Sequence, residues 1–126
     1  MSTRGMFGIV EGGKVHVVYN HCNSYPEGLG IILQENYNTI DKIKMTMKLG
    51  DFCSLENTLE TSKTFSREGE ELLIEPRVFT SKDEMVKQCR ESFSAEYFYL
   101  FENGKWHICT RTGWHELTDV LKELES

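Results

Sequence analysis

The chain has 126 residues, of which 39% are hydrophobic and 27% are charged, a composition typical of one soluble globular domain with its own core. Its 14 basic and 20 acidic residues leave a net charge of −6, which argues against broad binding to a nucleic-acid backbone. No apolar run approaches a membrane span, and the N-terminus lacks a signal-peptide pattern. We therefore expect one domain over residues 1–126 that binds neither nucleic acid nor membrane and stays in the compartment where it is made.

Residues 5–21 predict a β-hairpin that turns at Gly12-Gly13, because two β-branched, apolar runs flank a dipeptide suited to positive φ. In this register position i faces position 25 − i, so that Glu11 and Lys14 form a charge pair beside the turn. The same register continues to the start of the chain, where it places Gly5 opposite Asn20.

Residues 96–111 predict a second hairpin, which turns at Asn103-Gly104. Position i then faces position 207 − i, and Phe101 pairs with Trp106. The aromatic residues of this hairpin could form a stacking face for single-stranded nucleic acid. The negative net charge argues against that reading, and a sheet face packed under the C-terminal helix is the better prediction.

Helical spacing of apolar residues predicts a helix over residues 29–47, which Asn36 and Asn38 could divide into two. Ser81 followed by Glu84 predicts a capped helix that runs to about residue 93. Apolar residues from Trp114 to Leu124 form an amphipathic stripe typical of a C-terminal helix.

The segment between residues 51 and 80 is the least readable part of the chain. Residues 52–59 are compatible with a short helix, and residues 71–79 with a strand that Pro76 confines to a sheet edge. Together these elements predict an α+β fold, in which two antiparallel β-hairpins form a sheet and about three to four helices pack on it.

Four cysteines are scattered along the chain without C-x-x-C spacing: Cys22, Cys53, Cys89 and Cys109. In a cytosolic protein they are interpreted as free thiols, mostly small buried hydrophobic side chains. A zinc site would need four convergent ligands. His107 and Cys109 instead share a predicted strand face with apolar residues, so we predict neither a metal site nor a cofactor.

The loop YNHCNSYPEGLG, residues 19–30, concentrates polar and aromatic residues beyond the needs of a turn. The register of the first hairpin brings this loop and the N-terminal residues to the same end of the sheet. Arginine suits a phosphate or carboxylate, and tyrosine suits stacking. The residues predicted to bind a ligand or partner are Thr3, Arg4, Tyr19, Asn20, His21, Asn23, Ser24 and Tyr25.

The same loop also has a purely architectural interpretation. Asn23 and Ser24 can satisfy backbone groups of the turn, and Pro26 presets an extended-to-turn step. Gly28 supplies a permissive dihedral, and Gly30 allows a close contact between helix and sheet. The sequence alone leaves both interpretations open.

The loop also carries a resemblance to a family of small bacteriophage and prophage proteins. The resemblance rests on an N-terminal T-R-G, the pattern Y-N-H-x-[DN]-S-Y-P-x-G-L-G and an aromatic C-terminal hairpin. It is specific over residues 3–30 and looser over residues 96–114. Asn23 stands where the resembling sequences often carry aspartate, so we expect no carboxylate role there. The matching residues are Thr3, Arg4, Gly5, Tyr19, Asn20, His21, Asn23, Ser24, Tyr25, Pro26, Gly28, Leu29 and Gly30.

This resemblance implies a phage accessory protein in the bacterial host cytoplasm. Many such proteins act by binding, so the expected activity is inhibition of a host defence protein or sequestration of its nucleotide signal. The expected partner is a host protein or a small nucleotide-like ligand, and a homodimer is left open.

The alternative function is an enzyme resembling N-terminal-nucleophile hydrolases or amidotransferases. Ser2 or Thr3 would be the nucleophile, with His21 or Cys22 nearby. The fragment M-F-G-I-V resembles the start of such amidotransferases, but Phe7 occupies the place of their cysteine. The sequence offers no convincing set of acid, base and orienting group, which makes binding the better prediction.

Overall fold

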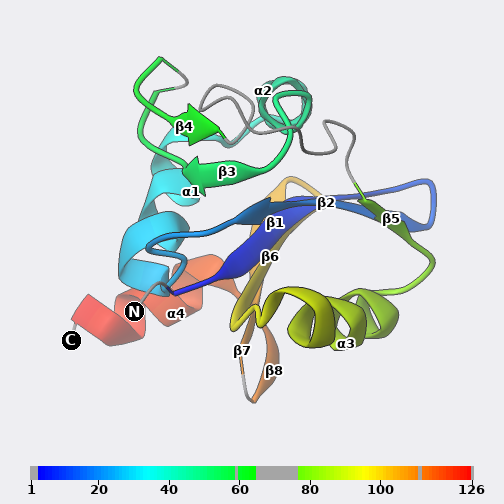
Figure 1. Ribbon diagram of the computed structural model, residues 1–126. Coiled ribbons are helices and arrows are strands. Elements are labelled where there is room, and N and C mark those ends of the chain that lie inside the picture. The colour runs from blue at the N-terminus through cyan, green and yellow to red at the C-terminus, as the bar shows by residue number, and fades with distance from the viewer. Residues whose placement is uncertain (1–2, 59, 65–76, 111, 126) are drawn as a thin grey trace.

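The computed structural model describes residues 3–58, 60–64, 77–110 and 112–125. Over these ranges the chain forms an eight-stranded sheet with helices on both faces (Figure 1). The strands are β1 (Gly5–Glu11), β2 (Lys14–Asn20), β3 (Phe52–Ser54), β4 (Lys63–Thr64), β5 (Arg77–Phe79), β6 (Tyr97–Glu102), β7 (Lys105–Thr110) and β8 (Gly113–Glu116). The helices are the π-helical turn η1 (Pro26–Gly30), α1 (Ile31–Asn36), α2 (Ile40–Met47), α3 (Lys82–Phe93) and α4 (Leu117–Glu125).

Both predicted hairpins are confirmed with their registers. The β1–β2 ladder runs from Glu11 opposite Lys14 to Gly5 opposite Asn20, and the β6–β7 ladder includes Phe101 opposite Trp106. All four residues of the two turns have positive φ, between 55° and 77°, as the two-residue turns of hairpins require. The local turn chemistry was therefore sufficient to predict the register.

The sheet as a whole is mixed, which corrects the prediction of a sheet made of two antiparallel hairpins. Its strand order is β4-β3-β2-β1-β6-β7-β8, and β5 pairs with β2. The two hairpins join through a parallel pairing of β1 with β6, in which Gly5 lies opposite Tyr97. The α+β class is confirmed. The parallel pairing of β1 with β6 depends on contacts between segments about 90 residues apart. The residues of a turn determine only the pairing of the two strands that the turn connects, so they could not predict it.

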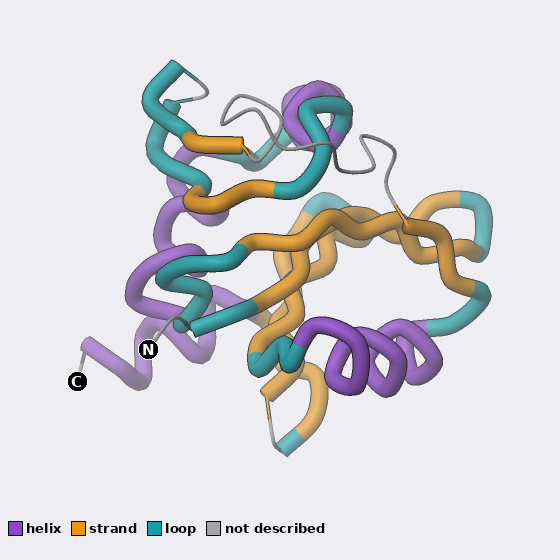
Figure 2. The backbone as a smooth tube through the Cα atoms, in the orientation of Figure 1, coloured by secondary structure: helices purple, strands orange, loops and turns teal. Residues whose placement is uncertain are grey.

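Helices cover the two faces of the sheet with separate hydrophobic clusters. On one face η1, α1, α2 and α4 cover a cluster that includes Phe7, Tyr99 and Trp106, and on the other α3 covers a cluster that includes Met85 and Phe98 (Figure 2). The aromatic residues Tyr99, Phe101 and Trp106 are all buried, so they are unavailable to stack on nucleic acid. Over the described residues, no helix combines the length and apolarity that crossing a bilayer requires.

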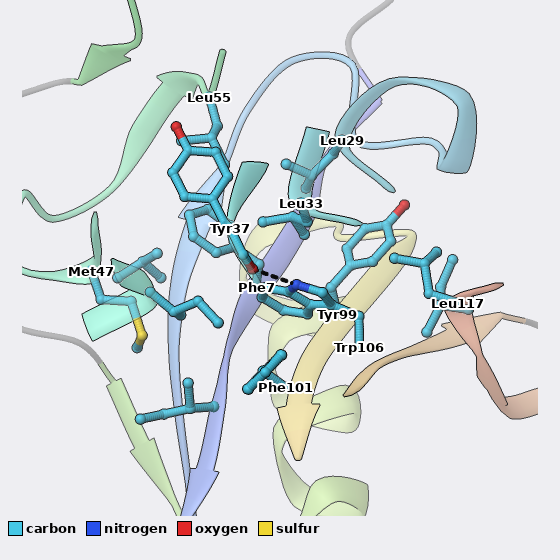
Figure 3. Close-up of a cluster of buried hydrophobic side chains, with 14 of the residues drawn as sticks. Phe7, Leu29, Leu33, Tyr37, Met47, Leu55, Tyr99, Phe101, Trp106 and Leu117 are labelled. Carbon is cyan, nitrogen blue, oxygen red and sulfur yellow. Dashed lines mark hydrogen bonds between the residues drawn. The ribbon is translucent and has the colours of Figure 1, made fainter. Parts of the chain in front are cut away.

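The sequence left open whether Asn36 and Asn38 divide the first helical segment, and the structure divides it there: α1 ends at Asn36 and α2 begins at Ile40. The indole N–H of Trp106 donates a 2.7 Å hydrogen bond to the carbonyl oxygen of Tyr37, in the break between the two helices (Figure 3). The Ser81 cap is also confirmed: its hydroxyl accepts the N–H of Glu84 at 3.1 Å and opens α3.

Two element predictions are wrong, and one lies partly outside the described residues. Residues 52–54 form strand β3 rather than a helix, because pairing with β2 and burial of Phe52 override a weak local preference. Trp114 belongs to β8, so the C-terminal helix begins only at Leu117. Of the predicted edge strand, residues 71–76 lie outside the described residues, and Arg77–Phe79 forms β5 against β2.

Candidate functional site

The N-terminus and the loop meet at one end of the sheet, as the register predicts. The N–H of Ser24 donates to the carbonyl oxygen of Thr3 at 3.0 Å, and the N–H of Glu96 donates to the carbonyl oxygen of Arg4 at 2.8 Å. A Cβ on Gly5 would lie 2.7 Å from the Cβ of Ser24, so the close approach requires a glycine there. Three distant segments are therefore joined at this end.

Asn20 and Ser24 form the buried half of the loop. The amide nitrogen of Asn20 donates to the carbonyl oxygen of Cys22 at 2.8 Å and to the hydroxyl of Ser24 at 2.9 Å. Its amide oxygen accepts the N–H of Leu55 at 3.0 Å. The carbonyl oxygen of Ser24 accepts the Tyr99 hydroxyl at 2.7 Å. These bonds hold the loop to β6 and to the residue that follows β3. The side chains of Asn20 and Ser24 therefore face the interior rather than a ligand.

The turn after the buried half is shaped by backbone geometry. Asn23 has a φ of 59°, in the left-handed region, and its carbonyl oxygen accepts the N–H of Leu29 at 2.9 Å. A Cβ on Gly28 would lie only 2.5 Å from that oxygen, so glycine is needed at this point of the turn. The side chains of Asn23 and Tyr25 are exposed, and Tyr25 is the large aromatic residue that the loop presents to solvent.

Arg4, Tyr19 and His21 form the other half of the predicted site, beside the C-terminal end of α3. The Tyr19 hydroxyl lies 2.7 Å from His21 Nδ1, and Arg4 Nη1 donates to the Phe93 carbonyl oxygen at 3.3 Å. The Tyr19 ring stacks on Phe93 with centroids 5.0 Å apart. Burial raises the pKa of Tyr19, and the Arg4 charge only partly opposes this effect. The phenol therefore stays protonated at neutral pH and cannot serve as a base.

Two charged residues that the sequence did not indicate complete this cluster. Arg77 of β5 forms two hydrogen bonds with the Asp51 carboxylate, at 2.7 and 2.8 Å, and its guanidinium lies 4.5 Å from the Phe93 ring centroid. Asp51 also accepts the N–H of Tyr19 at 3.0 Å, and its hydrogen bonds raise the pKa of Arg77. Because Asp51 and Arg77 are 26 residues apart in the chain, no regular spacing in the sequence predicts that they form a pair.

The eight predicted site residues thus divide by exposure. Tyr19, Asn20 and Ser24 are buried, Thr3, Arg4 and His21 are half-buried, and Asn23 and Tyr25 are exposed. The structure brings all eight to one end of the sheet but directs their side chains in different directions. The surface that a partner could touch is therefore smaller than the set predicted from the sequence.

An open groove lies next to the loop, and the sequence did not indicate it. It has a volume of about 750 Å³ and runs between the start of η1, the start of β6 and α4. A second hollow of about 310 Å³ lies between α1 and α4 and shares Glu27 and Leu124 with the first. Exposed Ile31 and Leu124 contribute apolar surface to the second hollow. In the sequence, the amphipathic stripe of α4 was interpreted only as the face that packs on the sheet.

Of the predicted nucleophiles, Thr3 is half-buried with its carbonyl oxygen bound to the loop, and Ser2 lies outside the described residues. Within the ranges that the structure describes, no three histidine, cysteine or acidic side chains group as metal ligands would. A scan against protein-family models finds no match for this chain, and searches of curated proteins and of solved structures find none either.

Proposed function

We propose that the protein is a non-catalytic binding protein whose partner is a protein of the bacterial host. The observation that carries this proposal is the division of the loop into a rigid buried half and an exposed half. Asn20 and Ser24 hold the backbone, while at the same end of the sheet Tyr25 is exposed and Arg4 and His21 are half-buried. Tyrosine and arginine on a rigid support are the residue types that dominate protein interfaces.

A protein partner suits this surface better than a nucleotide. A nucleotide site usually encloses its ligand and stacks the base on an aromatic ring. Tyr19 is already stacked on Phe93 and is buried, so it has no free ring face for a base. The phage setting that the N-terminal resemblance implies makes a host defence protein the partner that this proposal favours.

The proposal is tested by isolating the tagged protein from a bacterial host and measuring intact complexes by native mass spectrometry. We expect a host protein to co-purify in a fixed ratio and to be lost in both Arg4→Ala and Tyr25→Ala. Met45→Ala is the matched control, because Met45 is 61% exposed on α2, a different element, and should retain the partner. A bound mass of nucleotide size would support signal sequestration instead and contradict the proposal. Loss of the partner in the control would contradict the site assignment.

A further inference from the structure

The four cysteines fall into two classes in the structure. Cys89 and Cys109 are buried, and burial raises the pKa of both thiols, that of Cys89 to about 11. A buried thiol with a raised pKa forms little thiolate at neutral pH and reacts slowly. Cys22 and Cys53 are only half-buried. Oxidants in solution therefore have better access to this second pair.

We propose that Cys22 and Cys53 are a redox pair that a hydroperoxide oxidises to an intramolecular disulfide. The inference goes beyond the proposed function and does not depend on it. The two cysteines are distant in the sequence and lie outside any C-x-x-C motif. Only the fold makes them a pair.

The backbone places the two residues side by side. Cys53 is the central residue of β3, Cys22 follows the end of β2, and the two strands pair in parallel. The N–H of Cys22 donates to the carbonyl oxygen of Cys53 at 3.0 Å. Backbones joined in this way lie about 5 Å apart, and a disulfide spans Cα atoms that are about 4.4–6.8 Å apart. The separation of the two backbones therefore suits a disulfide.

The two side chains are also directed to the same face of the sheet. Phe52 packs in the cluster that α1 and α2 cover, so the next residue, Cys53, points to the opposite face. Tyr19 belongs to the cluster on that opposite face. Burial is the main cause of the raised pKa of Tyr19, and a charge on the Cys22 sulfur raises it further. The Cys22 sulfur is therefore within electrostatic reach of the Tyr19 hydroxyl, on the same face as Cys53.

The oxidation is balanced with one molecule of hydrogen peroxide. A thiolate of the pair attacks a peroxide oxygen, an S–O bond forms and the O–O bond breaks, which leaves a sulfenic acid and releases water. The second thiolate attacks that sulfur, the S–S bond forms and the S–O bond breaks, which releases a second water. The two sulfurs lose two electrons, and these reduce the peroxide. A thiol reductant reverses the reaction by disulfide exchange.

The disulfide would close a segment of the chain that contains η1, α1 and α2. It would also link the loop of residues 19–30 covalently to β3. A cross-link between residues distant in the sequence restricts the unfolded chain and so favours the folded state. We therefore expect the oxidised protein to unfold at a higher urea concentration than the reduced protein.

The test treats the folded wild-type protein with hydrogen peroxide and maps its cysteines by mass spectrometry. The four cysteines lie in four different tryptic peptides, so each pairing gives its own cross-linked mass. We expect one disulfide-linked species, which joins residues 15–42 to residues 49–63, in about tenfold excess over any other pairing. Dithiothreitol should restore four alkylatable thiols and return the urea midpoint to its value before oxidation.

Cys22→Ser and Cys53→Ser should each abolish the cross-link, and peroxide should leave the urea midpoint of both variants unchanged. Cys89 and Cys109 serve as internal controls and should remain alkylatable once the oxidised protein is unfolded. The inference is overturned by a cross-link that includes either control cysteine, by a covalent dimer, or by oxidation that adds oxygen without a cross-link. Retention of all four thiols in excess peroxide overturns it too. So does a Cys22–Cys53 cross-link that lowers the urea midpoint, because such a bond would distort the fold.

Discussion

At the scale of single residues, Asn20 shows why a polar residue in a suggestive loop need not be a ligand-binding residue. Its side chain makes three hydrogen bonds, to Cys22, Ser24 and Leu55. It is 1% exposed, so its amide is unavailable to a ligand. The sequence shows the residue type and its register position, but only the chain around it shows which way the side chain points.

We expect Asn20→Ala to lower the free energy of unfolding by about 2–4 kcal/mol, because it leaves the buried N–H of Leu55 and the carbonyl oxygen of Cys22 without these partners. Urea unfolding followed by tryptophan fluorescence measures the change. Asn38→Ala, at an exposed position, should change stability by less than about 0.5 kcal/mol. Similar small losses in both variants would mean that the Asn20 bonds contribute little to the fold.

At the scale of elements, the Asp51–Arg77 pair connects two parts of the sheet that are 26 residues apart in the chain. Asp51 precedes β3, Arg77 begins β5, and both strands pair with β2. The pair lies mostly out of solvent, with side chains 4% and 21% exposed. Removal of one partner therefore leaves a poorly solvated charge.

Asp51→Asn should lower the free energy of unfolding by about 2–3 kcal/mol, because the Arg77 cation loses its counter-charge while the shape of the site is kept. The matched control is Glu11→Gln, which removes one partner of the exposed Glu11–Lys44 pair and should cost less than about 1 kcal/mol. Chemical denaturation at neutral pH compares the two. If both variants lose equally little, the buried pair does not hold the strands together.

At the scale of the whole molecule, the buried tyrosines and a buried cysteine link stability to alkaline pH. Burial raises the pKa of Tyr19, Tyr37 and Tyr99, and it raises the pKa of Cys89 to about 11. The folded state thus keeps protons that the unfolded chain releases. Stability from these groups is fully present below their unfolded pKa values, of about 8.5 for cysteine and about 10 for tyrosine, and is lost as the pH rises through the folded values.

We therefore expect the free energy of unfolding to fall as the pH rises from about 8.5 to about 11, and to be insensitive to these groups at neutral pH. Tyr99→Phe should make the alkaline decline shallower, because it removes the hydroxyl whose pKa lies well above the ordinary value. It should also lower stability at neutral pH through loss of the bond to Ser24. Urea titrations at several pH values measure both effects. An identical alkaline slope in the variant would contradict this origin of the decline.

The sequence by itself determined the local structure of this protein. Gly12-Gly13 and Asn103-Gly104 predicted both hairpins with their registers, and Ser81 predicted the start of α3. These features depend on neighbouring residues only, since turns need positive φ and helix ends need a cap. The gathering of the eight site residues at one end of the sheet follows from the same register.

Only the tertiary structure decided how these pieces are joined and which side chains face a partner. The parallel pairing of β1 with β6, the strand at residues 52–54 and the Asp51–Arg77 pair all depend on residues distant in sequence. The burial of Asn20 and Ser24 has the same cause. Packing between distant segments determines burial and side-chain direction, and no periodicity or spacing within one segment carries that information.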